Sequence, residues 1–243
     1  MNSSSLYDDY ASAQSYREHM PLTLFYGKKD FEEHVKPYLP KDKSIRILDI
    51  GCGHGTCINE LIKSGYVNVE GVDISPDQIA LAKEQFRLQN VFCEDPIEFL
   101  ENKSDYYEVI LLTNLLEHLE LNYSIELLKK VHLSLKKTGF FIAQVPNAFS
   151  PFCPHLYMDI THLRAYSTTS FSQLFKMAGF SKGSFSPVFP RAISKFRNFM
   201  TKFLWKCILN PLLAIYFSAS LNCRIGSVYT PNLLAIVHKS ELN

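Results

Sequence analysis

The segment "MDITHLRAYS", residues 158–167, gathers side chains that could handle a proton and an anion. It holds Asp159, His162 and Arg164 together with hydroxyl side chains. A histidine can take a proton from a hydroxyl nucleophile because its ordinary pKa lies near neutral pH, and Asp159 could orient it. An arginine can bind a phosphate or carboxylate through two parallel hydrogen bonds. The same residues could instead brace a polar loop, and the sequence leaves both roles open for His162.

The glycine-rich stretch "LDIGCGHG", residues 48–55, is a second candidate site. Its glycines let the backbone approach a ligand closely, and Asp49 closes the preceding strand. "GVDIS" places Asp73 at the end of the next strand, about twenty residues on, where an acidic side chain can accept hydrogen bonds from a ribose diol. The glycine spacing does not fit the dinucleotide fingerprint, so it indicates another nucleoside-binding family.

The elements that position these side chains follow from alternating apolar runs and amphipathic segments. The pattern predicts βαβ units, with strands at 45–50, 67–74, 91–95, 107–114 and 140–145. It predicts helices over 56–65, from Ser75-Pro76 onward, and over 124–137, with Gly139 ending the last. We expect both candidate sites at the carboxyl edge of this sheet, where ligands bind in open α/β folds.

After Pro146 the chain no longer alternates short apolar runs with amphipathic segments. A loop leads to a capped helix that ends at Gly179, and strands are predicted at 185–189 and 232–238. Hairpin connections are usually a few residues long, so the segment 190–228 is an insertion. We predict a single domain, with an N-terminal helical segment at 1–44, a core at 45–147 and an acceptor-side portion at 148–243.

The insertion mixes basic, aromatic and apolar residues. Its first part alternates Arg191, Lys195, Lys202 and Lys206 with Phe196, Phe199, Phe203 and Trp205. The stretch 207–221 is strongly apolar, but Asn210 and Pro211 interrupt it and it is too short to span a bilayer. Four interpretations are open: an active-site cap, a homodimer surface, peripheral contact of 191–221 with anionic lipid, and core packing.

Charge is divided unevenly along the chain. Up to Asp159 there are 15 Lys and Arg against 23 Asp and Glu, whereas residues 160–240 hold 10 basic residues and no acidic one. This asymmetry favours an anionic partner for the basic portion. The polar, acidic start is not a secretory signal, and the six cysteines form no CxxC pair. We therefore expect a cytoplasmic protein, with the inner face of the membrane as an alternative location.

Five motifs occur together across residues 45–147. They are "ILDIGCGHG", "GVDIS", "CEDPIEFL", "YEVILLTNLLEHL" and "LSLKKTGFFIAQVPN". In order and spacing they resemble the class I S-adenosylmethionine-dependent methyltransferases. The resemblance implies a seven-stranded Rossmann-like sheet with helices on both faces and a helical insertion between the last two strands. It also implies S-adenosyl-L-methionine as cofactor and S-adenosyl-L-homocysteine as product.

The resemblance also implies which residues bind the cofactor. The glycine turn would face its methionine and ribose portions, Asp73 its ribose hydroxyls and Asp95 its adenine amine. The full predicted set is Asp49, Gly51, Cys52, Gly53, Gly55, Asp73, Ile74, Glu94, Asp95, Pro96, Thr113 and Asn114.

"NLLEHL" bears on a metal. Some methyltransferases hold a divalent cation with Glu-x-x-Glu-His and a later histidine, and here Asn114 replaces the first glutamate before Glu117 and His118. Hard cations favour carboxylate oxygens, so we predict no metal site.

"MDITHLRAYS" and the helix after it resemble a part of methyltransferases from bacterial surface-glycan and natural-product pathways. That resemblance predicts O-methylation of an anionic acceptor, a sugar hydroxyl or phosphate-type oxygen in capsule or O-antigen biosynthesis. A quinol or other lipid-soluble small molecule is the alternative acceptor, which the apolar insertion would suit. A catalytically silent, cofactor-binding partner of an active methyltransferase is a further alternative. We expect no nucleic-acid partner, because the resemblance includes no added RNA-binding module.

Overall fold

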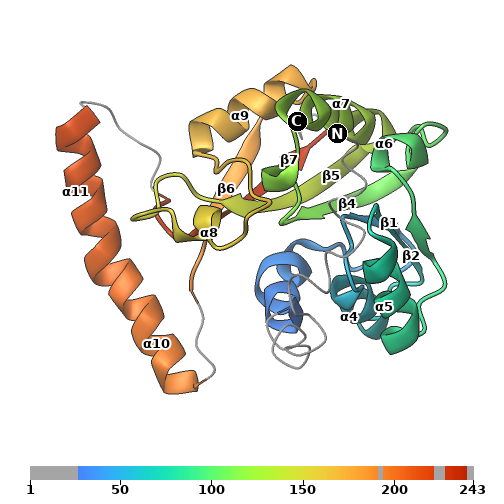
Figure 1. Cartoon of the computed structure of the whole chain (residues 1–243), viewed down its shortest axis with the longest axis horizontal. Coiled ribbons are helices and arrows are strands. Elements are labelled where there is room, and N and C mark those ends of the chain that lie inside the picture. The colour runs from blue at the N-terminus through green and yellow to red at the C-terminus, as the bar shows by residue number, and fades with distance from the viewer. Residues whose placement is uncertain (1–26, 191–193, 222–227, 240–243) are drawn as a thin grey trace.

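The computed structural model describes residues 27–190, 194–221 and 228–239. A seven-stranded sheet runs through it in the order β3-β2-β1-β4-β5-β7-β6 (Figure 1). Its strands are β1 (Arg46–Ile50), β2 (Asn68–Asp73), β3 (Val91–Cys93), β4 (Tyr107–Thr113), β5 (Leu135–Pro146), β6 (Gly183–Val188) and β7 (Asn232–His238). The first five strands are parallel, and β7 pairs antiparallel with both of its neighbours. The predicted fold class is confirmed.

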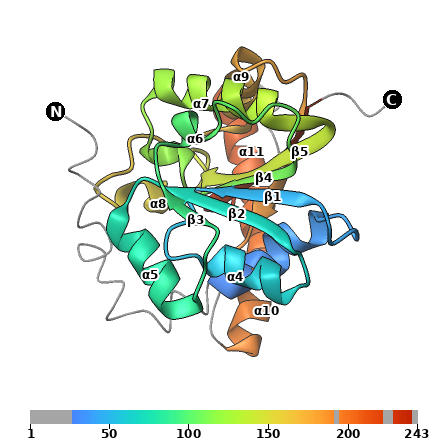
Figure 2. The same cartoon turned by 90° about the vertical axis from the view of Figure 1, so that its right-hand side faces the viewer.

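Helices cover both faces of the sheet (Figure 2), with α4 and α5 on one face and α6, α7 and α9 on the other. The helical elements are η1 (Phe31–Val35), η2 (Lys36–Tyr38), α4 (Thr56–Lys63), α5 (Pro76–Phe86), α6 (Pro96–Phe99), η3 (Leu116–His118), α7 (Leu121–Ser134), α8 (Pro154–Tyr157), α9 (Thr168–Met177), α10 (Lys195–Leu204), η4 (Trp205–Leu209) and α11 (Asn210–Leu221). Of the predicted N-terminal segment 1–44, residues 1–26 lie outside the described part of the chain.

The core divides into two layers because successive residues of a strand point to opposite faces. Leu48 of β1 packs in the cluster that contains Leu128 of α7 and Phe171 of α9. Its neighbour Ile47 packs in the cluster that contains Phe31 of η1. The continuous apolar run of β1 is therefore buried on both faces, which holds the glycine turn that follows it on a rigid strand.

The helix that was predicted to end at Gly139 ends earlier in the structure. Helix α7 ends at Ser134, and residues 135–137 already belong to β5 rather than to the helix. The pairing of β4 with β5 shifts register between Tyr107 and Val109. At this irregularity a Cβ on Gly139 would lie 3.0–3.1 Å from three main-chain carbonyl oxygens. Glycine is therefore needed at position 139 because a side chain would be too close to these main-chain oxygens, and not because a helix ends there.

The predicted insertion lies between β6 and β7, as the sequence pattern indicates. Helices α10 and α11, with η4 between them, form one long helix at the edge of the molecule (Figure 1). Helix α9 precedes β6 in the sequence, and Ser167 caps its N-terminus. In this capping box Ser167 Oγ accepts from the Ser170 N–H at 3.1 Å. The segment "MDITHLRAYS" thus ends at the start of a helix packed on the sheet.

Candidate functional site

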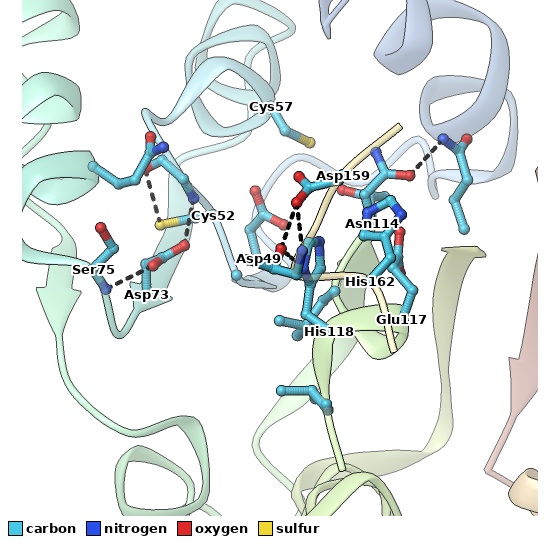
Figure 3. Close-up of a pocket in the computed structure, with 18 of the residues that line it drawn as sticks. Asp49, Cys52, Cys57, Asp73, Ser75, Asn114, Glu117, His118, Asp159 and His162 are labelled. Carbon is cyan, nitrogen blue, oxygen red and sulfur yellow. Dashed lines mark hydrogen bonds between the residues drawn. The ribbon is translucent and has the colours of Figure 1, made fainter. Parts of the chain in front are cut away.

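A cavity of about 910 Å³ lies where β1, β2 and β4 end, between the glycine turn and the loop that carries α8. Figure 3 shows Cys52, Asp73 and Ser75 on one side of this cavity and Glu117, His118, Asp159 and His162 on the other, with Asp49 between them. The two candidate sites of the sequence therefore face one cavity.

Asp49 is a buried carboxylate at the floor of the cavity. Its side chain is 1 % exposed, and its Oδ1 atom has no hydrogen-bond partner. Burial, and then the nearby charge of Asp73, raise the pKa of Asp49 to about 7. A buried carboxylate with a free acceptor suits a cationic ligand, such as the ammonium group of a bound amino acid.

The glycine turn wraps around the end of β2. Gly51 and Gly53 have φ angles of 71° and 51°, in the left-handed region that glycine tolerates best. A Cβ on Gly53 would have one neighbouring heavy atom within 4 Å, Gln78 Oε1 at 3.6 Å, so this part of the turn is open to a ligand. Cys52, between them, also lines the cavity.

Gly55 has a different place from the one predicted. It is not among the residues that line the cavity within the described part of the chain. A Cβ on Gly55 would lie 2.5 Å from Leu88 Cδ1 and 3.1 Å from the Ala82 Cβ, and its φ angle is 79°. This glycine lets the turn pack closely on the segment around α5.

Asp73 holds the turn together and also faces the cavity. Its Oδ2 accepts from the Gly53 N–H at 2.8 Å, and its Oδ1 accepts from the Ser75 N–H at 2.9 Å. Burial raises the pKa of Asp73 above its ordinary value, and these two hydrogen bonds oppose that rise. A carboxylate has about four acceptor sites, so Asp73 can still accept from ligand hydroxyls.

Four of the predicted cofactor-binding residues follow β2 and β3, and three of them line the cavity. Ile74, Asp95 and Pro96 line the cavity, whereas Glu94 is exposed and is not among the described lining residues. Asp95 caps α6 by accepting from the Ile97 N–H at 2.8 Å, and Tyr123 Oη donates to its Oδ2 at 2.8 Å. The Asp95 carboxylate is thus fixed by the helix it caps.

Thr113 and Asn114 line the cavity at the end of β4. Asn114 has a φ angle of 54°, which is strained for a residue with a Cβ. Its N–H donates to the Gln144 carbonyl at 2.9 Å, and its Oδ1 accepts from Gln144 Nε2 at 3.1 Å. These two bonds to β5 hold the strained residue at the cavity edge.

The imidazole of His162 has a defined orientation. Its Nδ1 lies 2.6 Å from the His155 carbonyl oxygen. A carbonyl can only accept, so Nδ1 carries the proton and Nε2 is the basic nitrogen of the neutral ring. The rings of His162 and His118 meet edge to face, with centroids 4.5 Å apart. His162 therefore lines the cavity as a side chain able to accept a proton.

Asp159 acts on the neighbouring histidine through Thr161. Its Oδ1 accepts from the Thr161 N–H at 2.9 Å and from the Thr161 hydroxyl at 2.7 Å. The hydroxyl proton is thus used, so Thr161 Oγ1 accepts from His118 Nδ1, which lies 2.8 Å away. Burial, and then the neighbouring His162, lower the pKa of His118 to about 4. The aspartate was expected to orient His162, which stays a prediction, and the hydrogen bonds through Thr161 connect its carboxylate to His118.

Glu117, His118 and His162 form a cluster that could hold a divalent cation. Each offers one ligand atom, and these atoms lie within 4.8 Å of one another. Glu117 is 1 % exposed, its Oε2 has no hydrogen-bond partner, and burial followed by the charge of Asp159 raises its pKa to about 8. The absence of a metal stays a prediction, and these are the residues that a cation would use.

Arg164 does not line the cavity, where it was predicted to bind an anionic acceptor. It is not among the described lining residues, and its Nη2 lies 3.8 Å from Glu120 Oε2. Among the residues that the structure describes, the cavity lining includes no lysine or arginine at all, but it includes several carboxylates. The described residues of the lining therefore offer no guanidinium or ammonium group to an anionic acceptor.

Three residues at the site were missed by the sequence analysis. His155 supplies the carbonyl that orients His162, and its own ring lies 2.6 Å from Asn232 Oδ1 at the start of β7. Thr161 links Asp159 to His118. Thr161 and His155 lie in or near the quoted segment, but no spacing rule pairs Asn232 with a residue 77 positions earlier.

The comparisons with known proteins agree with this fold. A family model described as a methyltransferase domain matches residues 16–182. A solved S-adenosylmethionine-dependent methyltransferase from Archaeoglobus fulgidus superposes with a TM-score of 0.63 at 22% identity, covering 88% of this chain and 94% of that one. One from Thermotoga maritima, titled a possible histamine N-methyltransferase, gives a TM-score of 0.64 at 16% identity, covering 94% and 96%.

Two curated relatives share a name. The mitochondrial ubiquinone biosynthesis O-methyltransferase of Saccharomyces cerevisiae is 27% identical over 113 residues, which are 44% of this chain and 36% of that protein. The ubiquinone biosynthesis O-methyltransferase of Coxiella burnetii is 40% identical over 80 residues, 31% of this chain and 33% of that protein. The matches span about a third of the length of these relatives.

Proposed function

We propose, from the premise that this chain belongs to the methyltransferase-domain family, that it transfers a methyl group from S-adenosylmethionine to a hydroxyl oxygen of an uncharged, lipid-soluble acceptor. The supporting observation is that the cavity joins the glycine turn and Asp73 to His162 while its described lining includes no basic side chain other than histidine. S-adenosylmethionine, when bound, supplies an electrophilic methyl group on a sulfonium.

The residues of the turn fit that cofactor. The free Oδ1 of buried Asp49 would accept from its ammonium group, Asp73 would accept from its ribose hydroxyls, and the open face of Gly53 gives it room. Ile74 would pack against its adenine, because it offers the half-buried apolar side chain at that end of the cavity.

His162 prepares the acceptor. Its Nε2 would take the proton of the acceptor hydroxyl, which leaves the oxygen with an electron pair that can accept the methyl group. The electrons of the broken carbon–sulfur bond would stay on sulfur, which leaves as S-adenosylhomocysteine. The proton then resides on an imidazolium whose Nδ1 already donates to the His155 carbonyl, so the charge is partly compensated.

An uncharged acceptor is favoured over an anionic glycan precursor by the cavity itself. Met158 and Ile160 line it near His162 and are 77% and 100% exposed, so apolar side chains are available to an acceptor there. The names of the curated relatives, which act in ubiquinone biosynthesis, point to the same class of acceptor, a quinol or similar phenol. The surface-glycan acceptor has no corresponding support.

Release of S-adenosylhomocysteine tests this proposal. The purified full chain is offered quinols with short and long apolar tails, together with nucleotide sugars and glycan phosphates as competing acceptors. We expect turnover with the quinols. Turnover with only the sugar or phosphate acceptors would reject the lipid-soluble class. Tight binding of S-adenosylhomocysteine without turnover of any acceptor would instead indicate a catalytically silent partner.

A further inference from the structure

The long helix 195–221, formed by α10, η4 and α11, is the most exposed apolar element that the structure describes. By length and composition this helix could cross a membrane, and only 6% of its most apolar stretch of 18 residues is buried. Figure 1 shows it at one edge of the molecule, outside the layers that cover the sheet. Burial in the core of the domain, one of the predicted alternatives, therefore does not explain this helix.

The N-terminal half of this helix has a regular apolar stripe. Exposed side chains recur at the i, i+3, i+4, i+7 and i+8 positions that share one helix face. They are Phe196, Phe199, Met200, Phe203 and Leu204. The C-terminal half continues the exposed apolar surface with Ile208, Leu212, Ile215 and Tyr216. We call these nine residues the apolar stripe.

Contacts with the domain in both halves of this helix argue against a transmembrane orientation. In the first half, Lys202 Nζ lies 3.0 Å from Glu33 Oε2. In the second half, the Phe217 ring stacks on Tyr229 with centroids 5.5 Å apart. A helix that crosses the hydrocarbon core must be surrounded by lipid over about 30 Å, so the folded domain would have to enter the bilayer with it. A helix joined to the domain in each of its halves can instead lie flat on a membrane surface.

The loop 147–167, which connects β5 to α9 and carries α8, contacts the same helix. Phe149, at the start of this loop, packs its ring on Phe217 at 5.1 Å between centroids. Phe152 of the same loop is 95% exposed. Met158 and Ile160 of the same loop line the cavity. The same loop therefore contacts the helix and lines the cavity, and it carries exposed apolar side chains.

Charge distinguishes a lipid surface from a second copy of the chain. Residues 160–240 contain no acidic side chain, and Lys195 and Arg197 are exposed next to the apolar stripe. Pairing two copies through this helix would bring like charges together. A bilayer with anionic headgroups supplies an apolar interior for the stripe and negative charge for the basic side chains.

We propose that the helix 195–221 docks this protein on an anionic membrane surface, lying in the plane of the interface with the apolar stripe inserted. This docking rests on the helix alone and does not depend on which acceptor is methylated.

Co-sedimentation with vesicles measures the docking directly. The full chain is mixed with phosphatidylcholine vesicles with and without phosphatidylglycerol. We expect co-sedimentation with the anionic vesicles, weakened by salt. Replacing Phe196, Phe199 and Phe203 by serine should lower vesicle affinity at least about tenfold, since each loses buried apolar area.

A matched variant separates membrane insertion from general loss of apolar surface. Ile62, Val67 and Leu133 are also exposed and lie outside the helix, and replacing them by serine should leave vesicle affinity unchanged. Circular dichroism checks that both triple variants fold. Equal vesicle binding by the two triple variants, or no binding to any vesicle, would overturn the docking. A dimer that the Phe-to-Ser changes dissociate, without vesicle binding, would assign the stripe to a second copy.

The outcomes remain separable from those of the acceptor assay. Vesicle binding is measured without cofactor or acceptor, and turnover is measured on short-tailed quinols without vesicles. Vesicle binding with no quinol turnover would retain the docking and reject the acceptor class, and the converse result would do the opposite.

Discussion

The Nδ1 atom of His162 donates to the main-chain carbonyl of His155 at 2.6 Å, and this single contact decides which ring nitrogen faces the cavity. Both residues lie on the loop that follows β5, and the His155 ring is in turn held at Asn232 of β7. The orientation of the proposed base therefore depends on a strand that comes after the insertion.

Replacing His162 by alanine should reduce turnover about 100-fold or more, because a positioned base contributes that much to proton transfer. Calorimetry with S-adenosylhomocysteine should show unchanged cofactor affinity. His238→Ala serves as the control, since this histidine lies at the far end of β7 beside Phe140. Full turnover by His162→Ala would assign the residue to bracing the loop.

Asp73→Ala should weaken S-adenosylhomocysteine binding about 100-fold, because it removes a charged acceptor and also releases the Gly53 and Ser75 N–H groups. Glu94→Ala is the matched carboxylate control and should bind normally, since Glu94 does not line the cavity. An unchanged dissociation constant for Asp73→Ala would contradict the cofactor site. Weakened binding by Glu94→Ala would instead indicate that Glu94 contacts the cofactor, as the sequence predicts.

Cofactor affinity should fall as pH decreases below about 7. The pKa of Asp49 is raised to about 7 in the free protein, and a bound ammonium group would lower it, so binding releases a proton. Affinity is then greatest above pH 7 and decreases as the free carboxyl becomes protonated. Titration calorimetry from pH 5 to pH 9 measures this, and Asp49→Asn should flatten the profile. A flat profile for the unchanged chain would remove Asp49 from the cofactor site.

Dialysis against a chelator should leave quinol turnover unchanged, because the proposed reaction uses His162 as a base. Glu117, His118 and His162 are nevertheless placed to hold a divalent cation. If the chelator abolished turnover and added Mg²⁺ or Zn²⁺ restored it, the cluster would be a metal site. Metal analysis of Glu117→Gln would then show whether this buried carboxylate is a ligand.

The side of the cavity that carries the glycine turn was largely predictable from the sequence. The strand, the glycine turn and Asp73 are encoded by neighbouring residues, because backbone geometry at Gly51 and Gly53 depends on local sterics. The alternation of apolar runs likewise predicted the strands and the position of the insertion. Gly55 and Glu94 departed from expectation because a spacing pattern does not show which side of a turn packs on a helix and which faces a ligand.

The acceptor side was decided by tertiary structure. The link from Asp159 through Thr161 to His118 joins a loop to η3, across 43 residues between Thr161 and His118. Arg164 pairs with Glu120 instead of facing the cavity, and Asn232 arrives from the last strand. Side chains so distant in sequence meet only when the sheet and its helices have packed, since packing and not local propensity determines which faces come together. The sequence by itself determined a cofactor-binding α/β sheet, and tertiary packing decided which residues complete the site.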